Sequence, residues 1–264
     1  MKAFQDKIVW ITGASSGIGE ELAIQTAAAG AKIILSARNV EKLKVLKDKL
    51  ANSERHLIVA LDLEDSANFP ELVQNVVAHF GRIDFLFNNG GISQRSEVHE
   101  TPIEVDRRIM ETNYFGNIAL TKAVLPVFRR QKSGHFIVIS SIAGKFGFFL
   151  RSAYSASKHA LHGFYESLML EEEKNNIYVT IVCPGKINTQ ISVNALNASG
   201  DSHGVMDHNQ ETGMSASDCA RAIIQATIAH KPEVLIGKKE IKAVTLKRFF
   251  PKLFWKVIRK QSAT

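Results

Sequence analysis

Three side chains suited to acid/base chemistry lie close together in the middle of the chain. Tyr154 follows Ser141 by thirteen residues, and Lys158 follows the tyrosine by four. Residues four apart on a helix share one face, so the phenol and the ammonium can act on one reacting proton. This spacing indicates a catalytic site. A tyrosine and a lysine also occur at this spacing by chance on many helices, so the interpretation needs support from other motifs.

A glycine-rich segment, Thr12 to Gly19 (TGASSGIG), follows the first apolar run. Glycines at a turn from strand to helix let the backbone approach a pyrophosphate, and the helix N-terminus adds N–H groups and the positive end of its dipole. We therefore expect a dinucleotide site at this turn. The residues expected to line it are Gly13, Ser15, Ser16, Gly17, Ile18 and Gly19.

The segment after the second apolar run indicates which dinucleotide is bound. An acidic residue there usually binds the adenosine ribose 2′-hydroxyl, whereas a 2′-phosphate needs a cation. Residues 36–39 read SARN, with no Asp or Glu. We therefore predict NADP(H) in preference to NAD(H), with Arg38 at the 2′-phosphate; the alternative is that Arg38 only opens a solvated helix. Asp62, followed by Leu63, is expected to bind the adenine amino group or else to cap its own loop.

Short β-branched runs alternate with longer stretches of helical periodicity. The predicted strands cover 7–12, 32–36, 56–61, 83–87, 135–140, 178–183 and 233–236, and the predicted helices cover 20–29, 40–50, 70–80, 102–130, 154–174 and 216–229. Nearly continuous apolar runs are typical of strands buried on both faces. Their alternation with helices predicts an α/β fold, a doubly wound, seven-stranded parallel sheet (Rossmann fold) in a single domain.

We expect residues 1–240 to form the catalytic domain and residues 241–264 to form a separate basic tail. Within the domain, residues 186–213 are rich in Asn, Ser, Gly and His and have no clear period. Such a stretch predicts a mobile substrate loop beside the site that could act as a lid.

The net charge of +7 does not indicate nucleic-acid binding, because it is concentrated at one end. Residues 231–264 hold ten Lys or Arg residues and two glutamates, so the rest of the chain is nearly neutral. Cys183 and Cys219 form no CxxC pair, and we expect no disulfide framework and no metal site. The chain enters a strand-like run at Lys7 and has no bilayer-length apolar run, so we expect a cytoplasmic protein without a signal peptide.

The tail segment 242–260 mixes basic and apolar residues. The basic residues are Lys247, Arg248, Lys252, Lys256, Arg259 and Lys260, and the apolar ones are Phe249, Phe250, Leu253, Phe254, Trp255, Val257 and Ile258. On a helix broken at Pro251 they form an apolar face with a cationic rim, as in segments that lie in an anionic membrane surface. We expect peripheral membrane contact; the competing interpretation is that the aromatic face packs on a sister subunit or covers the substrate pocket.

Taken together, the motifs between residues 7 and 237 resemble those of the short-chain dehydrogenase/reductase family. The matching residues are 12–19 (TGASSGIG), 88–91 (NNGG), Asn113 in ETNYFG, Ser141, Tyr154 with Lys158, and Pro184-Gly185 with Thr189. Gly90 stands where the family usually has alanine, which concerns only the packing of that loop.

The resemblance implies a role for each matching residue. Tyr154 is the general acid in carbonyl reduction and the base in the reverse direction, Lys158 lowers its pKa and binds the nicotinamide ribose, and Ser141 holds the substrate oxygen. Asn113 supports a water chain that resupplies the proton. The remaining implied cofactor contacts are Asn89 and Gly91 at the adenosine ribose, Pro184 and Gly185, and Ile187 and Thr189 at the carboxamide.

Residues 146–150 (FGFFL) predict an apolar wall beside the reacting carbonyl, although these side chains could instead pack in the core. His159 and His162 share a metal-like helical spacing, but without a third ligand cluster we interpret them as helix-surface residues. The expected protein is a carbonyl reductase that interconverts a lipophilic ketone or aldehyde and its alcohol with NADP(H), as a homodimer or homotetramer. The alternative is a catalytically silent NADP(H)-binding sensor or scaffold.

Overall fold

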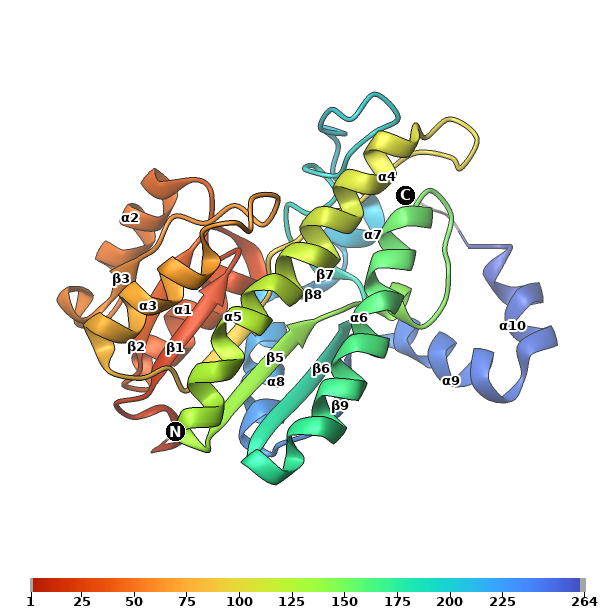
Figure 1. The fold of residues 1–264 in the computed structure, drawn as a ribbon. Helices are drawn as coiled ribbons and strands as arrows, with labels where there is room; N and C mark the ends of the chain where they lie inside the picture. Colours follow the sequence, from red (N-terminus) through yellow and green to blue (C-terminus); the bar gives the residue numbers. More distant parts are fainter. Residues whose placement is uncertain (1, 262–264) are drawn as a thin grey trace.

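A computed structural model describes residues 2–261 and contains the predicted seven-stranded parallel sheet (Figure 1). Its strands lie in the order β3-β2-β1-β4-β5-β6-β9. Their bounds are β1 (Ile8–Thr12), β2 (Lys32–Ser36), β3 (Leu57–Ile58), β4 (Phe85–Asn88), β5 (Gly134–Ile139), β6 (Ile177–Pro184) and β9 (Glu233–Ile236). The prediction of a doubly wound Rossmann fold in a single domain is confirmed.

Helices cover both faces of this sheet, with α5 and α8 on opposite sides (Figure 1). One face carries α1 (Gly17–Ala28), α2 (Val40–Lys49) and α8 (Ala216–Ile228), and the other carries α3 (Phe69–Phe80), α5 (Gly116–Gln131) and α6 (Ser152–Glu172). Side chains alternate between the two cores along β1, where Val9 and Ile11 face the first and Ile8 and Trp10 face the second. Both sides are apolar, so the strand sequences are nearly continuous apolar runs.

The strand order reverses between β1 and β4, which opens a crevice at their carboxyl ends. The hydroxyl oxygen of Thr12, at the end of β1, accepts N–H bonds from Asn89 (3.0 Å) and Gly90 (2.9 Å), just after β4. These bonds hold the glycine-rich turn against the loop that follows β4. The topology therefore brings two of the sequence motifs to one edge of the sheet.

The predicted helix 102–130 is confirmed over residues 103–131, but it is not α-helical throughout. It consists of α4 (Ile103–Met110), a π-helical turn (Glu111–Phe115) and α5, and Pro126 lies inside α5 without ending it. Such turns insert one extra residue into a helical turn and often occur at functional sites. Asn113 lies within this π-helical turn.

Two other boundaries differ from the sequence-based prediction. The third strand pairs only at Leu57–Ile58, although Val59 and Leu61 still donate backbone bonds to Leu35 and Ala37. The segment 186–213 is partly ordered, because it contains β7 (Ile187–Asn188), which pairs with β8 (Met214–Ser215), and α7 (His208–Glu211).

The tail forms two short helices, α9 (Lys242–Phe249) and α10 (Pro251–Ile258), which extend from the side of the molecule (Figure 1). Phe254 and Ile258 are buried against Phe146, which precedes α6. Across residues 2–261, every helix is too short or too polar to span a bilayer.

Candidate functional site

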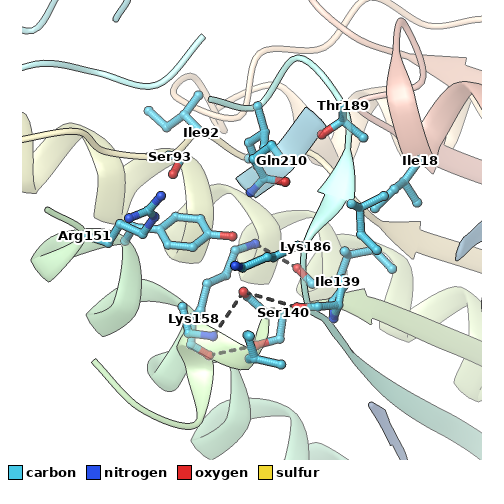
Figure 2. Close-up of a pocket in the computed structure, with 18 of the residues that line it drawn as sticks. Ile18, Ile92, Ser93, Ile139, Ser140, Arg151, Lys158, Lys186, Thr189 and Gln210 are labelled. Carbon is cyan, nitrogen blue, oxygen red and sulfur yellow. Dashed lines mark hydrogen bonds between the residues drawn. The ribbon is translucent and has the colours of Figure 1, made fainter. Parts of the chain in front are cut away.

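A cavity of about 1380 Å³ lies at the carboxyl edge of the sheet. Seventeen of the nineteen candidate residues line it: Gly13, Ser15, Ser16, Gly17, Ile18, Arg38, Asp62, Leu63, Asn89, Gly91, Ser141, Tyr154, Lys158, Pro184, Gly185, Ile187 and Thr189. The two that do not are Gly19 and Asn113, which support residues that do. Figure 2 shows Lys158 and Arg151 on one side of this cavity and Ile18, Thr189 and Gln210 on the other.

The glycine-rich turn is built by conformations and contacts that side chains would disturb. Gly13 and Gly17 have φ angles of +63° and +59°, a region that favours glycine. A Cβ on Gly19 would lie 2.3 Å from the Gly13 carbonyl oxygen, so this glycine lets α1 pack on the turn. Asn89 donates bonds to the carbonyls of Thr12 (3.0 Å) and Gly13 (3.2 Å). The turn is therefore held open toward the cavity.

The cavity continues past the end of β2, where Arg38 and Asp62 line it. The Arg38 side chain is 58% exposed, and its Nη1 lies 4.0 Å from Oε1 of Glu64. Glu64 also accepts a bond from Nε of Arg108 (3.1 Å). Asp62 accepts the backbone N–H of Glu64 (3.0 Å), so it caps its own loop, the alternative that the sequence left open.

Tyr154 and Ser141 meet at the end of β5. Ser141 caps a short helical turn by accepting the N–H of Ala143 (3.1 Å), and Tyr154, in the first turn of α6, is 8% exposed. Burial raises the pKa of Tyr154, and a hydrogen bond with Ser141 and the charges of Arg151 and Arg95 act in the opposite direction without outweighing it. The phenol is therefore held in its neutral form at neutral pH.

The predicted lowering of the Tyr154 pKa by Lys158 is wrong. The Lys158 ammonium donates to the carbonyl of Ile139 (2.8 Å) and lies 5.8 Å from the centroid of the Tyr154 ring (Figure 2). Burial lowers the pKa of Lys158 itself to about 8. The cations that favour phenolate are Arg151 and Arg95, neither of which the sequence indicated.

Asn113 lies behind the cavity and is fully buried. Its Oδ1 accepts the N–H of Ile92 (2.7 Å), and its Nδ2 donates to the carbonyl of Ile92 (2.9 Å) and to Oγ of Ser157 (3.0 Å). These bonds join the loop after β4 to α6. A Cβ on Gly91 would lie 2.9 Å from Oδ1 of Asn113, so a glycine fits this close approach. The water chain expected at Asn113 stays a prediction.

A buried cluster of Arg95, Asp207 and Arg151 lies beside Tyr154 and was missed from the sequence. Arg95 and Asp207 are each 1% exposed, with Nε of Arg95 2.9 Å from Oδ2 of Asp207. Nη2 of Arg151 donates to the same oxygen at 3.0 Å. Burial lowers the pKa of Arg151 to about 10, so it remains charged at neutral pH. The three residues lie far apart in sequence, and no spacing pattern could have linked them.

This cluster changes the interpretation of the loop 186–213. Asp207 lies within it, Arg151 directly precedes α6, and Arg95 follows β4. Two cations and one carboxylate thus tie three segments together at the wall of the cavity. The predicted mobile loop is anchored at Asp207 to the segment that begins α6.

His162 is not a helix-surface residue as predicted, although His159 is exposed. His162 is 7% exposed, with its Nε2 3.0 Å from Oγ of Ser140 and its Nδ1 3.2 Å from Nζ of Lys145. Burial lowers its pKa to about 4, so the ring is neutral. Cys183 and Glu233 lie close to it, but the ammonium of Lys145 contacts both His162 and Glu233 and supplies the positive charge there.

The apolar wall of the cavity comes from two parts of the chain. Phe146 and Phe148 line it, whereas Phe149 is 47% exposed and lies outside. The tail adds Leu246, Phe250, Val257 and Ile258 to the same wall. The rings of Phe146 and Phe254 pack edge to face with centroids 5.2 Å apart. The inner side of α9 and α10 therefore covers the cavity, as the competing interpretation of the tail proposed.

The substitution Asp207→Asn should destabilise the protein. It removes the buried carboxylate that both guanidinium groups contact, so we expect a loss on the order of 3 kcal/mol in the free energy of unfolding. Urea denaturation followed by circular dichroism measures the loss. The control is Glu41→Gln in the exposed Lys44–Glu41 pair, for which less than about 1 kcal/mol is expected. Equal losses would contradict the role of the cluster.

Lys158→Met should stabilise the protein at pH 7. The pKa of Lys158 falls from 10.5 to about 8 on folding, so the unfolded chain binds this proton more tightly and the charged lysine opposes folding below pH 8. We expect the variant to gain roughly 2 kcal/mol at pH 7, after the loss of the bond to Ile139, and the gain to disappear as the pH rises from 8 to 10.5.

Urea denaturation at pH 7 and at pH 10 tests this expectation, with Lys174→Met as the exposed control. A gap between Lys158→Met and the parent protein that does not change with pH would show that the buried ammonium is not the cause.

Comparisons with known proteins agree with this geometry. The family model described as "short chain dehydrogenase" matches residues 7–199. A Drosophila melanogaster protein, "Dehydrogenase/reductase SDR family protein 7-like", is 42% identical over 97% of this chain and 80% of its own length. A short-chain dehydrogenase from Streptomyces avermitilis is 30% identical, with a TM-score of 0.82 over 97% of this chain and 98% of its own.

A second solved structure, a short chain dehydrogenase/reductase from Burkholderia phymatum in complex with NAD, shares the fold with a TM-score of 0.84. It is 22% identical, and the match covers 96% of each chain. The sequence motifs had indicated a glycine-rich turn and a set of Ser141, Tyr154 and Lys158. In this chain the turn and the set line one cavity. The chain belongs to the short-chain dehydrogenase/reductase family of nicotinamide-dependent oxidoreductases.

Proposed function

We propose that the protein interconverts a lipophilic ketone or aldehyde and its alcohol with NADP(H), using Tyr154 as the acid/base. The observation that carries this proposal is the position of Ser141, Tyr154 and Lys158 in the cavity that also contains the glycine-rich turn. A hydroxyl, a neutral phenol and a cation thus lie within one site. Such a set is suited to proton transfer at a carbonyl oxygen.

The residues at the turn fit a dinucleotide. Gly13 and Gly17 leave the backbone open beside the N-terminus of α1, which favours the negative charge of a pyrophosphate. At the other end, Lys158, Ile187 and Thr189 would hold the nicotinamide half. When bound, the nicotinamide exchanges a hydride with the carbonyl carbon.

The protein's own part is to hold the carbonyl oxygen and to move a proton. Ser141 and Tyr154 present two hydroxyl groups to one oxygen, and the Tyr154 phenol is protonated at neutral pH, so it carries the proton that reduction requires. The phenolate that forms is stabilised by Ser141 and by the charges of Arg151 and Arg95. The Arg95–Asp207–Arg151 cluster holds these cations in place, since Asp207 contacts both.

Arg38 supports NADP(H) as the cofactor. It lines the cavity after β2, half-exposed, and residues 36–39 contain no carboxylate that would bind a ribose 2′-hydroxyl. Its Glu64 contact, at 4.0 Å, is loose. A 2′-phosphate would replace this loose ion pair with a charge-assisted hydrogen bond.

The wall made by Phe146, Phe148, Leu246, Phe250 and Val257 supports a lipophilic substrate.

We also propose a cytoplasmic location, with which the two free, buried cysteines agree. For assembly we propose a homodimer or homotetramer. The subunits would meet through α6 and through the long helix formed by the π-helical turn and α5. Phe115 in the turn is 48% exposed and Leu170 in α6 is 78% exposed, so both offer apolar surface to a second subunit.

The alternative is a silent NADP(H)-binding sensor or scaffold. Such a protein needs the glycine-rich turn but not a buried phenol between Ser141 and two arginines. The placement of Tyr154 therefore favours turnover over sensing.

Tyr154→Phe should lose carbonyl reduction and keep cofactor binding. The change removes only the transferable proton, so we expect kcat to fall by about 10²-fold to 10⁴-fold. Oxidation of NADPH with a panel of hydrophobic ketones and aldehydes measures turnover, and NADPH fluorescence measures binding. The exposed Tyr178→Phe is the matched control. Full turnover by Tyr154→Phe would exclude the proposed role, and a parent enzyme inactive on the whole panel would favour the sensor.

Arg38→Asp should weaken NADPH binding and leave or improve NADH binding. A charge-assisted bond to the 2′-phosphate contributes about 1.5–3 kcal/mol, so we expect the Kd for NADPH to rise at least tenfold. Titration with both cofactors measures the ratio, with the exposed Arg107→Asp on α4 as control. A parent protein that binds NADH as tightly as NADPH would contradict the predicted preference.

A further inference from the structure

The tail helices α9 and α10 keep several apolar side chains exposed that no described part of the chain covers. Phe249 is 65% exposed, Phe250 62%, Leu253 49%, Trp255 47% and Val257 41%. We call these five residues the arm face. Single exposed apolar residues are common on protein surfaces, but five within nine positions, three of them aromatic, are typical of a binding surface.

Positive charge surrounds the arm face. Lys247, Arg248, Lys252, Lys256, Arg259 and Lys260 lie among its residues, and positions 241–261 contain no Asp or Glu. Among the described residues, no ion pair involves positions 241–261. The Lys247 ammonium donates instead to the backbone carbonyl of Lys145. Within residues 2–261, no carboxylate side chain pairs with the arm, so a negatively charged partner would complement it.

The arm is held on the body by two buried apolar residues. Phe254 is 1% exposed and Ile258 9% exposed, both against Phe146. Pro251, at the first position of α10, separates the two helices. The apolar residues of the tail thus include this buried pair and the partly exposed arm face. Since the buried pair already anchors the arm, the exposed surface of the arm face is available to a partner.

We propose that the arm face binds an anionic lipid surface. Apolar side chains that enter the boundary between headgroups and acyl chains, together with basic residues that meet anionic headgroups, are what interfacial helices present to membranes. A second copy of this chain fits less well, because a symmetric contact would bring two cationic rims together. A nucleic acid would meet the charges but leave the apolar residues unused.

The same face borders the opening of the cavity. Phe250 and Val257 belong to the arm face and also line the cavity that contains Tyr154. Contact with lipid would therefore place this opening against the bilayer, where a lipophilic carbonyl compound is concentrated. This consequence rests on the proposed function, whereas lipid binding itself does not.

Binding is tested with the full chain and vesicles of phosphatidylcholine alone or mixed with phosphatidylglycerol. We expect the protein to float with the mixed vesicles, to remain in solution with phosphatidylcholine alone, and to lose binding at high salt. Fluorescence gives a second readout, because Trp255 is 47% exposed and the chain's other tryptophan, Trp10, is fully buried. Emission should shift to the blue only with the mixed vesicles, through Trp255.

Two double variants separate the parts of the arm face. Lys252→Glu with Lys256→Glu should lower partitioning onto mixed vesicles by tenfold or more, since each basic residue adds to the attraction. Phe249→Ser with Leu253→Ser should lower it even at low salt, where all the basic residues still attract the vesicles. The matched controls are Lys49→Glu with Lys231→Glu and Val45→Ser with Val98→Ser, all exposed and outside the arm. These controls should bind as the parent does.

Two outcomes would overturn the proposal: mixed vesicles that fail to bind the parent protein, and arm variants that float as well as their controls. If the parent does not float and sedimentation shows an oligomer that the Phe249→Ser/Leu253→Ser variant cannot form, the face is a subunit contact instead. Reduction of a water-soluble aromatic ketone without vesicles is the independent measure of the enzyme. If the protein does not float but still reduces the ketone, only lipid binding is refuted. If it floats but does not reduce the ketone, only the proposed function is refuted.

Discussion

The burial of a neutral phenol beside fixed positive charge is the constraint on which the rest of the site depends. Desolvation raises the pKa of Tyr154, and Ser141, Arg151 and Arg95 oppose that rise. Two buried guanidinium groups would themselves be costly, and Asp207 offsets them from a third segment of the chain. The environment of Tyr154 therefore depends on a carboxylate more than fifty residues away in sequence.

The same bonds that set the electrostatics also determine the shape of the cavity. Asp207 holds the loop 186–213 against the start of α6, and Asn113 holds the loop after β4 against the middle of that helix. Both walls of the cavity are thus joined to the element that carries Tyr154 and Lys158. A rigid frame of this kind is what alignment of a carbonyl with a hydride donor requires.

The tail packs on this frame through its buried residues and leaves other apolar residues exposed. Ile258 extends the apolar wall begun by Phe146, and Phe254 packs on Phe146, so α9 and α10 are part of the enclosure of the cavity. The exposed apolar residues of these helices are not part of the core. The proposed contact with a lipid surface would explain why they are apolar. Both interpretations that the sequence allowed for the tail, a cover for the pocket and a membrane-binding segment, are compatible because Phe250 and Val257 line the cavity and still leave 62% and 41% of their surface exposed.

The sequence by itself determined the parallel sheet, the glycine-rich turn and the spacing of Ser141, Tyr154 and Lys158, because periodicity and turn chemistry act between residues near one another in the chain. It did not reveal the Arg95–Asp207–Arg151 cluster, the burial of His162 or the π-helical turn at Asn113. It also gave the wrong direction for the pKa of Tyr154, since Lys158 bonds to Ile139 instead. Those features were decided only by the tertiary structure, because desolvation and ion pairing depend on which distant segments enclose a group.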